Sequence, residues 1–471
     1  MKNNQKGFIG VAVLFIVLAI AGIAGYYFVS QNVNRPTAPT TQVSNNFDQN
    51  DTYPSKPQNE VSQLPVTSPK QQENPTSNNQ PKPTPTVTPK PTPTPTNPTP
   101  SPAPATMSSK IDSCRTISTA GEYSLSTDLT NTKSEPCIKI QNVSNVTLDC
   151  QNHTITSKNE NYNIYVKGST NFKINNCKLV SSVSLPSEAT QHVFRVEDSK
   201  QGEVNNNTFG GNFVSISGSS LVTAQKNIFT NQFNVYKSNN VIIRENNFSG
   251  GVVPLTFQGG HDNSAISNFI DGKSDGIFKG LENSVGSDDG IVINDESGDL
   301  IQGNTLQNFF DCAIENTGYM FDTKIIGNKA SNAGVCFLGG WYYSSVKGIS
   351  VRDNVVSNMP NLFYFFRQYA LKSTEQYVYF QNNTFENNKL SNPKTDTGFS
   401  MASRFVFDGS AVPLQNHILG NNILRNNDFT KSLGPLRLSP KNIVTDGGGN
   451  ICSGAEEEAK GGGDAIPFNC N

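Results

Sequence analysis

The sequence has few charged and few hydrophobic residues for a chain of its length. Of 471 residues, 16% are charged and 35% are hydrophobic, and the formal net charge is −2. A nucleic-acid-binding protein would show a strongly basic domain or stripe, so this near-neutral balance argues against nucleic acid as a partner. Runs rich in the strong helix formers Leu and Ala are scarce, whereas Asn, Ser, Thr and Gly are abundant. The composition indicates strands and turns.

Cysteine is absent from the first 113 residues, and no CxxC pair occurs anywhere in the chain. A metal site would favour such pairs, so the sequence predicts no metal ligands. An even number of cysteines confined to one part of the chain instead suggests disulfides in an exported domain. The eight are Cys114, Cys137, Cys150, Cys177, Cys312, Cys336, Cys452 and Cys470.

The first 30 residues differ from the rest. Lys2 and Lys6 precede GFIGVAVLFIVLAIAGIAGYYFVS (7–30), an uncharged apolar run long enough to span a bilayer. The positive-inside rule predicts that residues 1–30 form a single-pass membrane anchor with the C-terminal part outside the cytoplasm. Two alternatives stay open. The small residues AIAG (19–22) could form a signal-peptidase site, and QKGF (5–8) resembles the start of a prepilin leader.

Residues 31–108 have no periodic apolar pattern, and PKPTPTVTPKPTPTPTNPTPSPAPA (81–105) alternates Pro with Thr. Such a segment forms neither helix nor sheet and favours extended polyproline II. At ~3.1 Å per residue it could hold a domain ~75 Å from a membrane. A spacer of this kind suits the crossing of a cell-wall layer, which favours a retained anchor.

Residues 109–471 repeat a short pattern around an asparagine, as in VNNNTF (204–209), AQKNIF (224–229), RENNFS (244–249) and IQGNTL (301–306). Seven of these asparagines are Asn207, Asn227, Asn247, Asn268, Asn304, Asn328 and Asn354. The first four are 20, 20 and 21 residues apart, and the last three are 24 and 26 apart. The interval of 36 between the two groups predicts an insertion at 270–287, or one further, poorly marked coil.

The physics of this repeat predicts an all-β solenoid. Each period contains short apolar runs separated by turn residues and has no sustained helical spacing. Strands that return once per repeat would stack in parallel at ~4.8 Å. Asparagine tolerates the left-handed conformation of a tight corner, and stacked side-chain amides can hydrogen-bond along a column. The asparagine columns are therefore expected to be structural.

These repeats, together with GEYSLSTDLTNTKSEPCIKIQNVSNVTLDCQNHTI (121–155), resemble right-handed parallel β-helix proteins of the pectin-lyase-like superfamily. The resemblance covers about 109–455 and implies the fold. That superfamily includes lyases, hydrolases, epimerases, phage tail-spikes and adhesins, so the resemblance implies no single function. The NTD, GHG and RIK motifs of polygalacturonase-like hydrolases, the WIDH-type segment of pectate lyases and the DPH signature of alginate epimerases are absent. No catalytic residue can be carried over.

The segment GSDDGIVIND (286–295) is the strongest candidate for an active site. Asp288, Asp289 and Asp295, with His261 or Arg367, could act as acid and base. Each has a plainer interpretation, because Asp and His are common in turns and an Arg often pairs with a neighbouring acid. Aligning coils by their cysteines predicts one column of Gly290, Cys312, Cys336 and Leu362, in which Asp289 and Asp311 share the preceding turn. Five positions later, Asp295, Thr317, Trp341 and Arg367 would lie along one face.

Aromatic residues gather in the same coils, in GGWYYSS (339–345) and NLFYFFR (361–367). Trp341, Tyr342 and Tyr343 could stack on sugar rings, and Arg367 could pair with uronic carboxylates. Alternatively, Trp341 caps an exposed coil edge, and every second aromatic of 363–366 belongs to the core.

Together these features predict a membrane-anchored, extracytoplasmic β-helix that binds polysaccharide or cell-envelope glycan and, in the stronger form of the hypothesis, processes it. The alternatives are a polysaccharide lyase or glycoside hydrolase, and a structural or adhesive surface spike. The sequence requires no cofactor. Calcium enters only if the protein is a lyase.

The coil register also predicts the disulfides, because each coil of a solenoid touches only its neighbours. Residues stacked one coil apart lie ~4.8 Å from each other, within disulfide reach. The predicted pairs are Cys114–Cys137, Cys150–Cys177, Cys312–Cys336 and Cys452–Cys470. The alternative for Cys312 and Cys336 is a pair of buried thiols.

Overall fold

The computed structural model describes residues 108–158, 162–182, 192–211, 213–280, 283–341, 343–367, 371, 375–399, 403–407, 414–432, 436–440, 442–452, 455–457 and 465–466. The chain divides into two units, Met1–Asn97 and Pro98–Asn471, and every described residue belongs to the second. The predicted anchor (1–30) and linker (31–108), apart from Ser108, lie outside the described residues. No helix within the described ranges has the length and apolar character needed to cross a bilayer.

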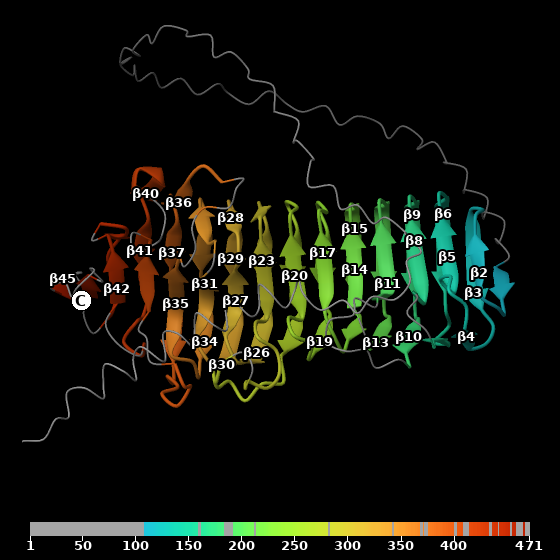
Figure 1. Cartoon of the computed structure of the whole chain (residues 1–471), viewed down its shortest axis with the longest axis horizontal. Helices are drawn as coiled ribbons and strands as arrows, with labels where there is room; N and C mark the ends of the chain where they lie inside the picture. Colours follow the sequence, from blue (N-terminus) through green and yellow to red (C-terminus); the bar gives the residue numbers. More distant parts are fainter. Residues whose placement is uncertain are drawn as a thin grey trace, which may run out of the picture. The chain divides into compact units, whose positions relative to one another are not determined.

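The described part of the chain is a parallel β-helix (Figure 1). A coil consists of three strands on three different sheets, as in β14 (Phe213–Ser217), β15 (Ser220–Gln225) and β16 (Ile228–Phe229). The next strand, β17 (Phe233–Tyr236), pairs in parallel with β14, so the chain has moved along by one coil. Such crossovers between parallel strands are right-handed. The predicted parallel β-helix is confirmed for the described residues, whereas the predicted membrane helix and linker before it stay predictions.

Sheet B contains 15 strands and carries the candidate site. All its neighbours pair in parallel except the last two, which are antiparallel. Its strands are β2 (Arg115–Ile117), β5 (Ile138–Gln141), β8 (Ile164–Lys167), β11 (His192–Glu197), β14, β17, β20 (Leu255–Gln258), β23 (Ile291–Asn294), β27 (Cys312–Asn316), β31 (Cys336–Gly340), β35 (Asn361–Phe366), β39 (Arg404–Val406), β42 (Leu436–Ser439), β44 (Ala455–Glu457) and β45 (Ala465–Ile466).

Sheet A contains 14 parallel strands. They are β1 (Ser109–Ile111), β3 (Gly121–Leu125), β6 (Ser144–Asp149), β9 (Thr170–Asn175), β12 (Lys200–Asn205), β15, β18 (Ile242–Arg244), β21 (Ser264–Ile266), β25 (Leu300–Gln302), β29 (Lys324–Ile326), β33 (Ser350–Arg352), β37 (Thr384–Glu386), β41 (Ile423–Arg425) and β43 (Thr445–Asp446).

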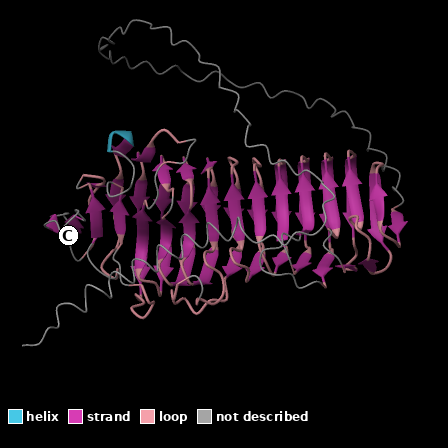
Figure 2. Cartoon of the chain, viewed as in Figure 1, coloured by secondary structure: helices cyan, strands magenta, loops and turns pink. Residues whose placement is uncertain are grey.

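Sheet C contains 11 strands, and a fourth sheet contains five. Sheet C consists of β4 (Leu129–Asn131), β7 (Thr154–Ser157), β10 (Lys178–Ser181), β13 (Thr208–Gly210), β16, β19 (Asn247–Ser249), β22 (Phe269–Asp271), β26 (Thr305–Phe309), β30 (Lys329–Ala333), β34 (Val355–Ser357) and β38 (Lys389–Ser391). The fourth sheet consists of β24 (Glu296–Ser297), β28 (Tyr319–Phe321), β32 (Ser345–Lys347), β36 (Val378–Gln381) and β40 (His417–Gly420). The helix drawn in Figure 2 is the short 3-10 turn η1 (Leu414–Asn416).

The core is the interior of the coils, and it follows from alternation along each strand. In β9, Phe172 and Ile174 are buried, while Lys173 between them points outward. Identical residues stack from coil to coil, and the rings of Phe209, Phe229 and Phe248 lie face to face at 4.8 and 4.7 Å. Stacking of this kind buries each coil's apolar row against its neighbours.

A ladder of buried asparagines runs along the turn between sheets A and C. The side-chain amide of each member donates to the Oδ1 of the next, as from Asn207 to Asn227 at 3.1 Å. Its members are Asn207, Asn227, Asn246, Asn268, Asn304, Asn328, Asn354, Asn388, Asn427 and Asn450. The predicted asparagine column is confirmed except at one coil, where Asn246 takes the place predicted for Asn247. Asn247 instead begins β19 and is exposed.

The long interval after Asn268 is an insertion and not a further coil. Strand β22 pairs directly with β26, and β20 pairs directly with β23. Residues 272–290 therefore leave the solenoid between neighbouring coils and return to it.

Three of the predicted disulfides are confirmed. Cys114–Cys137, Cys150–Cys177 and Cys312–Cys336 have Cα separations of 4.4, 4.8 and 4.6 Å. Cys452 is also disulfide-bonded. Its predicted partner Cys470 lies outside the described residues, so that pairing stays a prediction.

The strand register predicted around Cys312–Cys336 is wrong by one residue on both the preceding and the following coil. Cys312 does oppose Cys336, but Cys336 then opposes Asn361 instead of Leu362. On the other side Ile291 opposes Ile314, which shifts Gly290 out of the cysteine column. Coil lengths vary at the turns, and a single extra turn residue changes the alignment that spacing alone suggests.

Candidate functional site

Four acidic side chains meet on the outer face of sheet B. Asp288 and Asp289 precede β23, and Asp311 and Glu315 lie one coil further on, before and within β27. Carboxylate oxygens of Asp289 and Asp311 lie within 4.8 Å of each other. Backbone pairing fixes this arrangement, because the N–H of Asp311 donates to the carbonyl of Asp288 at 3.0 Å. We call these four residues the carboxyl cluster.

Hydrogen bonds distinguish the members of the carboxyl cluster. Asp289 accepts one from the backbone N–H of Cys312 at 3.1 Å and another from the carboxyl group of Glu315. Asp288 is half-buried, and its Oδ1 is buried without a hydrogen-bond partner among the described residues. The other three members are buried. Asp288 is therefore the member that reaches the surface.

Burial keeps protons on this cluster. It raises the pKa of Asp288 to about 8, with the charge of Asp289 adding to the shift. Burial, together with the neighbouring carboxylates, raises the pKa of Asp311 and of Glu315 well above the ordinary range. Burial also raises the pKa of Asp289, but its two hydrogen bonds oppose that change. Asp289 is thus the member whose ionised form is best stabilised.

Two loops lie over the coils next to this cluster. The insertion after β22 and the segment after β38 meet where the N–H of Phe278 donates to the carbonyl of Thr397 at 2.7 Å. Lys394 fixes the same contact, since its ammonium group donates to the carbonyl of Asp275 and to Oδ1 of Asn332, both at 2.9 Å. The loops thus form a cover held by a few polar contacts.

An aromatic cluster lies under this cover. The ring of Trp341 is 4.8 Å from that of Tyr364 and 5.9 Å from that of Phe399, and Phe278 lies 6.1 Å from Phe399. The guanidinium of Arg404 stacks 4.8 Å from the centre of the Tyr364 ring. Trp341 is half-buried and packed against other rings, so it is only in part the open sugar platform that the sequence predicts.

The aromatic and carboxyl clusters are neighbours across one glycine. Glu315 opposes Gly339 on the next strand, and Gly339 opposes Tyr364 on the strand after that. A Cβ at Gly339 would lie 2.7 Å from Sγ of Cys336, so the disulfide occupies the space that a side chain would need. The arrangement places acid–base groups and aromatic rings side by side on one outer surface.

Two predicted catalytic residues do not belong to this site. Asp295 follows β23, whereas Asp288 precedes it, so the whole strand, ~13 Å long, lies between them. The Oδ1 of Asp295 accepts from the backbone N–H of Tyr319 at 3.1 Å, which is a turn-stabilising role. His261 is exposed and its Nδ1 lies 2.8 Å from Asp262 in another turn. Both side chains occupy corners, as their plainer interpretation suggested.

Arg367 is a structural residue and not a surface contact for a uronic acid. It is 1% exposed. Its guanidinium donates to the carbonyls of Tyr343 and Ser344 at 2.6 and 2.9 Å and forms an ion pair with Glu375 at 2.7 Å. Tyr343 therefore contributes a backbone carbonyl to Arg367, and Tyr342 lies outside the described residues.

The predicted line of Asp295, Thr317, Trp341 and Arg367 is also wrong. Asn316 opposes Gly340, which opposes Phe365, so Arg367 falls one residue beyond the column that continues from Trp341. Gly318 and not Thr317 lies against the Asp295 carboxylate.

Sequence reasoning missed Glu315, Tyr364 and Phe399. A signal for Glu315 existed, because an acidic residue interrupts the apolar run of DCAIEN (311–316) at a position that alternation assigns to the outer face. Phe399 carries no such signal, since a loop distant in sequence brings it to the site.

Carboxylate oxygens are the ligands that Ca²⁺ prefers, and the ion takes six to eight of them. Asp289 and Asp311 are close enough to share a cation, and Cys312 lies beside them. Cys312 is committed to its disulfide and offers no thiolate. To bind a cation, Asp288 and Glu315 would also have to lose their protons. These residues therefore fit a protonated cluster better than a calcium site.

No protein-family model matches the chain, and no curated protein matches it. Solved structures with similar folds include PfbA, a surface adhesin of Streptococcus pneumoniae, at 13% identity over 68% of this chain and 86% of that chain, with a TM-score of 0.47. DFA-IIIase from Arthrobacter chlorophenolicus in complex with GF2 is 9% identical over 70% and 86%, with a TM-score of 0.41. A tailspike of an Escherichia coli bacteriophage in complex with a pentasaccharide is 12% identical over 74% and 60%, with a TM-score of 0.37. These likenesses assign no function.

Proposed function

We propose that this β-helix binds a polysaccharide on the outer face of sheet B and hydrolyses its glycosidic bonds with the carboxyl cluster. The observation that carries the proposal is the contrast between Asp288 and Asp289. The first reaches the surface with a pKa raised to about 8. Burial raises the pKa of the second as well, but Asp289 accepts two hydrogen bonds that favour its ionised form. Two carboxyl groups whose environments favour different protonation states can act as the acid and the base of glycoside cleavage.

In this proposal Asp288 is the proton donor. Its proton goes to the glycosidic oxygen as the bond from that oxygen to the anomeric carbon breaks. A water molecule forms the new bond to the anomeric carbon and gives its proton to the Asp289 carboxylate. Glu315 positions Asp289 through their shared hydrogen bond. Each of the two product chains ends in a hydroxyl group at the cleaved bond. Proton exchange with solvent then restores both aspartates.

The aromatic cluster supplies the binding surface next to these groups. Trp341 and Phe399 retain exposed area, and an aromatic face stacks well against the C–H face of a sugar ring. Asp289 is 1% exposed, so in this proposal the segments around it must move apart before a substrate reaches it.

Binding without cleavage is the second candidate function. One observation favours it: Asp289, Asp311 and Glu315 are all buried beside the closed cover. In that case the carboxyl cluster stabilises the cover, and the aromatic surface alone contacts the glycan.

We further propose that the domain is tethered outside the cytoplasm by residues 1–30 and the Pro/Thr-rich linker. The support is the Lys2 and Lys6 flank of the apolar run and the length of the spacer. Membrane fractions washed with carbonate should retain the protein. Release into the medium of a chain beginning near Gly22 would show instead that the segment is a cleaved signal.

The function is tested by incubating the full chain with neutral, N-acetylated and uronic polysaccharides. Reducing ends and the absorbance of unsaturated products are measured together with binding. Hydrolysis predicts new reducing ends without unsaturated products. Binding without new reducing ends or unsaturated products supports the second candidate. Unsaturated products would show that the protein is a lyase and not a hydrolase. The absence of both binding and products would contradict the proposal.

A further inference from the structure

A column of left-handed residues runs along the start of the sheet A strands. Eleven coils place a residue with φ between 51° and 74° at this position. The members are Asn145, Asn171, Gln201, Leu221, Asn240, Asp262, Gly298, Asp322, Gly348, Asn382 and Asn421. Asn, Asp and Gly tolerate this conformation, and they fill nine of the eleven positions. Leu221 is the apolar member of the column.

Neither the backbone conformation nor the burial of Leu221 favours a leucine at this position. A left-handed backbone brings its Cβ close to the following carbonyl oxygen, which disfavours it relative to Asn or Gly. Its side chain is also 54% exposed, so burial in the core does not offset that cost. Strained residues of this kind concentrate at sites where the strain serves binding.

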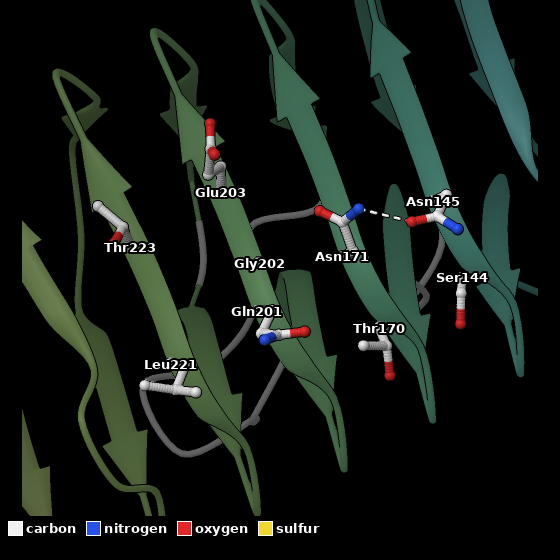
Figure 3. A pocket seen from close by; sticks show the side chains of 9 residues that line it. All are labelled: Ser144, Asn145, Thr170, Asn171, Gln201, Gly202, Glu203, Leu221 and Thr223. Atoms are coloured by element: carbon white, nitrogen blue, oxygen red, sulfur yellow. Dashed lines mark hydrogen bonds between the residues drawn. The ribbon is translucent and has the colours of Figure 1, made fainter.

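Leu221 lines a groove on the outer face of sheet A (Figure 3). The groove is shallow and open to solvent, with a volume of about 560 Å³. It crosses β6, β9, β12 and β15, so its length is ~14 Å at the spacing of stacked strands. The residues that matter for its chemistry are Asn145, Asn171, Gln201, Glu203, Leu221 and Thr223.

The lining combines hydrogen-bonding groups with a balanced charge. Asn171 donates to Asn145 at 2.6 Å, which leaves the other halves of both exposed amides directed to a ligand or solvent. Gln201 is exposed beside them. Glu203 forms an ion pair with Lys173 at 3.0 Å, so its charge is compensated. Amides and hydroxyls around one apolar side chain suit a neutral, hydroxyl-rich ligand.

We infer that this groove holds a segment of a neutral polysaccharide chain, with the amides of Asn145, Asn171 and Gln201 bound to sugar hydroxyls and Leu221 against the C–H face of a ring. The inference rests on the proposed carbohydrate function and adds a second site. The groove lies on a different sheet from the carboxyl cluster and on earlier coils. An extended peptide is the weaker candidate, because the backbone groups of these inner strands are already paired on both sides and offer no free edge.

The test compares Leu221→Asn with the wild-type full chain. An array of neutral and uronic oligosaccharides first identifies the best neutral binder, and calorimetry then measures its affinity for each variant. Leu221→Asn should weaken binding at least tenfold while raising Tm by about 2 °C, because Asn relieves the left-handed strain. If Leu221 had only a structural role, its replacement would not weaken binding and raise Tm at the same time. Val355→Asn, at a 50% exposed position on sheet C, is the matched control and should leave binding unchanged.

Three results would overturn the inference: no neutral oligosaccharide binds the wild-type chain, Leu221→Asn binds as well as wild type, or Val355→Asn weakens binding equally. This experiment measures binding and not cleavage, so its result is independent of whether the proposed hydrolysis occurs. A chain that binds through Leu221 but cleaves nothing contradicts the hydrolase proposal alone. If the chain cleaves polysaccharide but Leu221→Asn does not weaken binding, only the inference about the groove is contradicted.

Discussion

The carboxyl group of Glu315 hydrogen-bonds to that of Asp289, one coil earlier on the outer face of sheet B. In this hydrogen bond Glu315 donates and Asp289 accepts, so the bond opposes the rise that burial causes in the pKa of Asp289 and adds to the rise in the pKa of Glu315. Two carboxyl groups this close cannot both be ionised without strong repulsion. At least one member of the pair is therefore neutral, and Asp288 beside it adds a third carboxyl group whose raised pKa favours the protonated form.

This arrangement predicts the pH dependence of cleavage. A proton donor must be protonated, and the pKa of Asp288 is raised to about 8. The cleavage rate should therefore hold at neutral pH and fall as the pH rises through about 8. Initial rates of reducing-end release between pH 5 and 10 provide the measurement. A rate that instead falls above pH 5 would mean that an ordinary carboxyl is the donor.

A second acidic pair predicts the pH dependence of stability. Burial, with the charge of Glu296, raises the pKa of Asp299 from 3.8 to about 8, and burial raises the pKa of Glu296 to about 7. The folded chain holds these protons where the unfolded chain releases them. Their contribution to the free energy of unfolding is therefore full below pH 4 and is lost as the pH rises through 7 to 8.

Asp299→Asn tests this directly. The variant keeps an acceptor for the backbone N–H of Asn263, which Asp299 binds at 2.9 Å, and asparagine already occupies the equivalent turn position at Asn383. We expect a higher Tm than wild type at pH 8 and little difference at pH 4. Thermal melts at the two pH values measure it. Equal destabilisation at both would mean that the carboxylate makes a favourable contact.

Trp341→Ala should lower stability as well as glycan binding. The ring packs on Tyr364 and Phe399 beneath the cover, so its removal leaves a gap that costs about 2 kcal/mol. Phe269→Ala, which removes a 39% exposed ring on sheet C, is the comparison and should change Tm less. Urea titrations of both variants decide it. An unchanged free energy of unfolding for Trp341→Ala would show that the ring projects as a free platform.

The Cys312–Cys336 disulfide should affect both the stability of the fold and the carboxyl cluster. Replacing both cysteines by serine removes a link that closes a 24-residue separation, with an expected loss of about 3 kcal/mol in the free energy of unfolding. The Cys150–Cys177 pair has a separation of 27 and should cost a similar amount. Only the first replacement should also alter the carboxyl cluster, because Asp289 hydrogen-bonds to the Cys312 N–H. A shift in the pH–rate profile confined to that variant is the expected signature.

The asparagine spacing was sufficient to predict the solenoid, because one buried amide per coil is a local requirement that recurs in the sequence. The same periodicity identified the insertion and three disulfides. It could not fix the register, since neighbouring asparagines such as Asn246 and Asn247 satisfy the pattern equally well. Asp288 and Asp289 were found because they stand together in the sequence. Phe399 and the burial of Arg367 depend on loops and side-chain partners that no spacing encodes.

The central claim is that Asp288 is the proton donor, and the cleavage rate of a matched pair of variants tests it most directly. Asp288→Asn removes the proton at the carboxyl cluster. Asp275→Asn removes an exposed carboxylate of the same insertion, one that pairs with Lys279 at 2.7 Å. Removal of a general acid costs about 100-fold or more in rate. We predict that loss for Asp288→Asn and a nearly unchanged rate for Asp275→Asn, with both variants folded by thermal melting. Equal cleavage rates in the two variants would contradict the account.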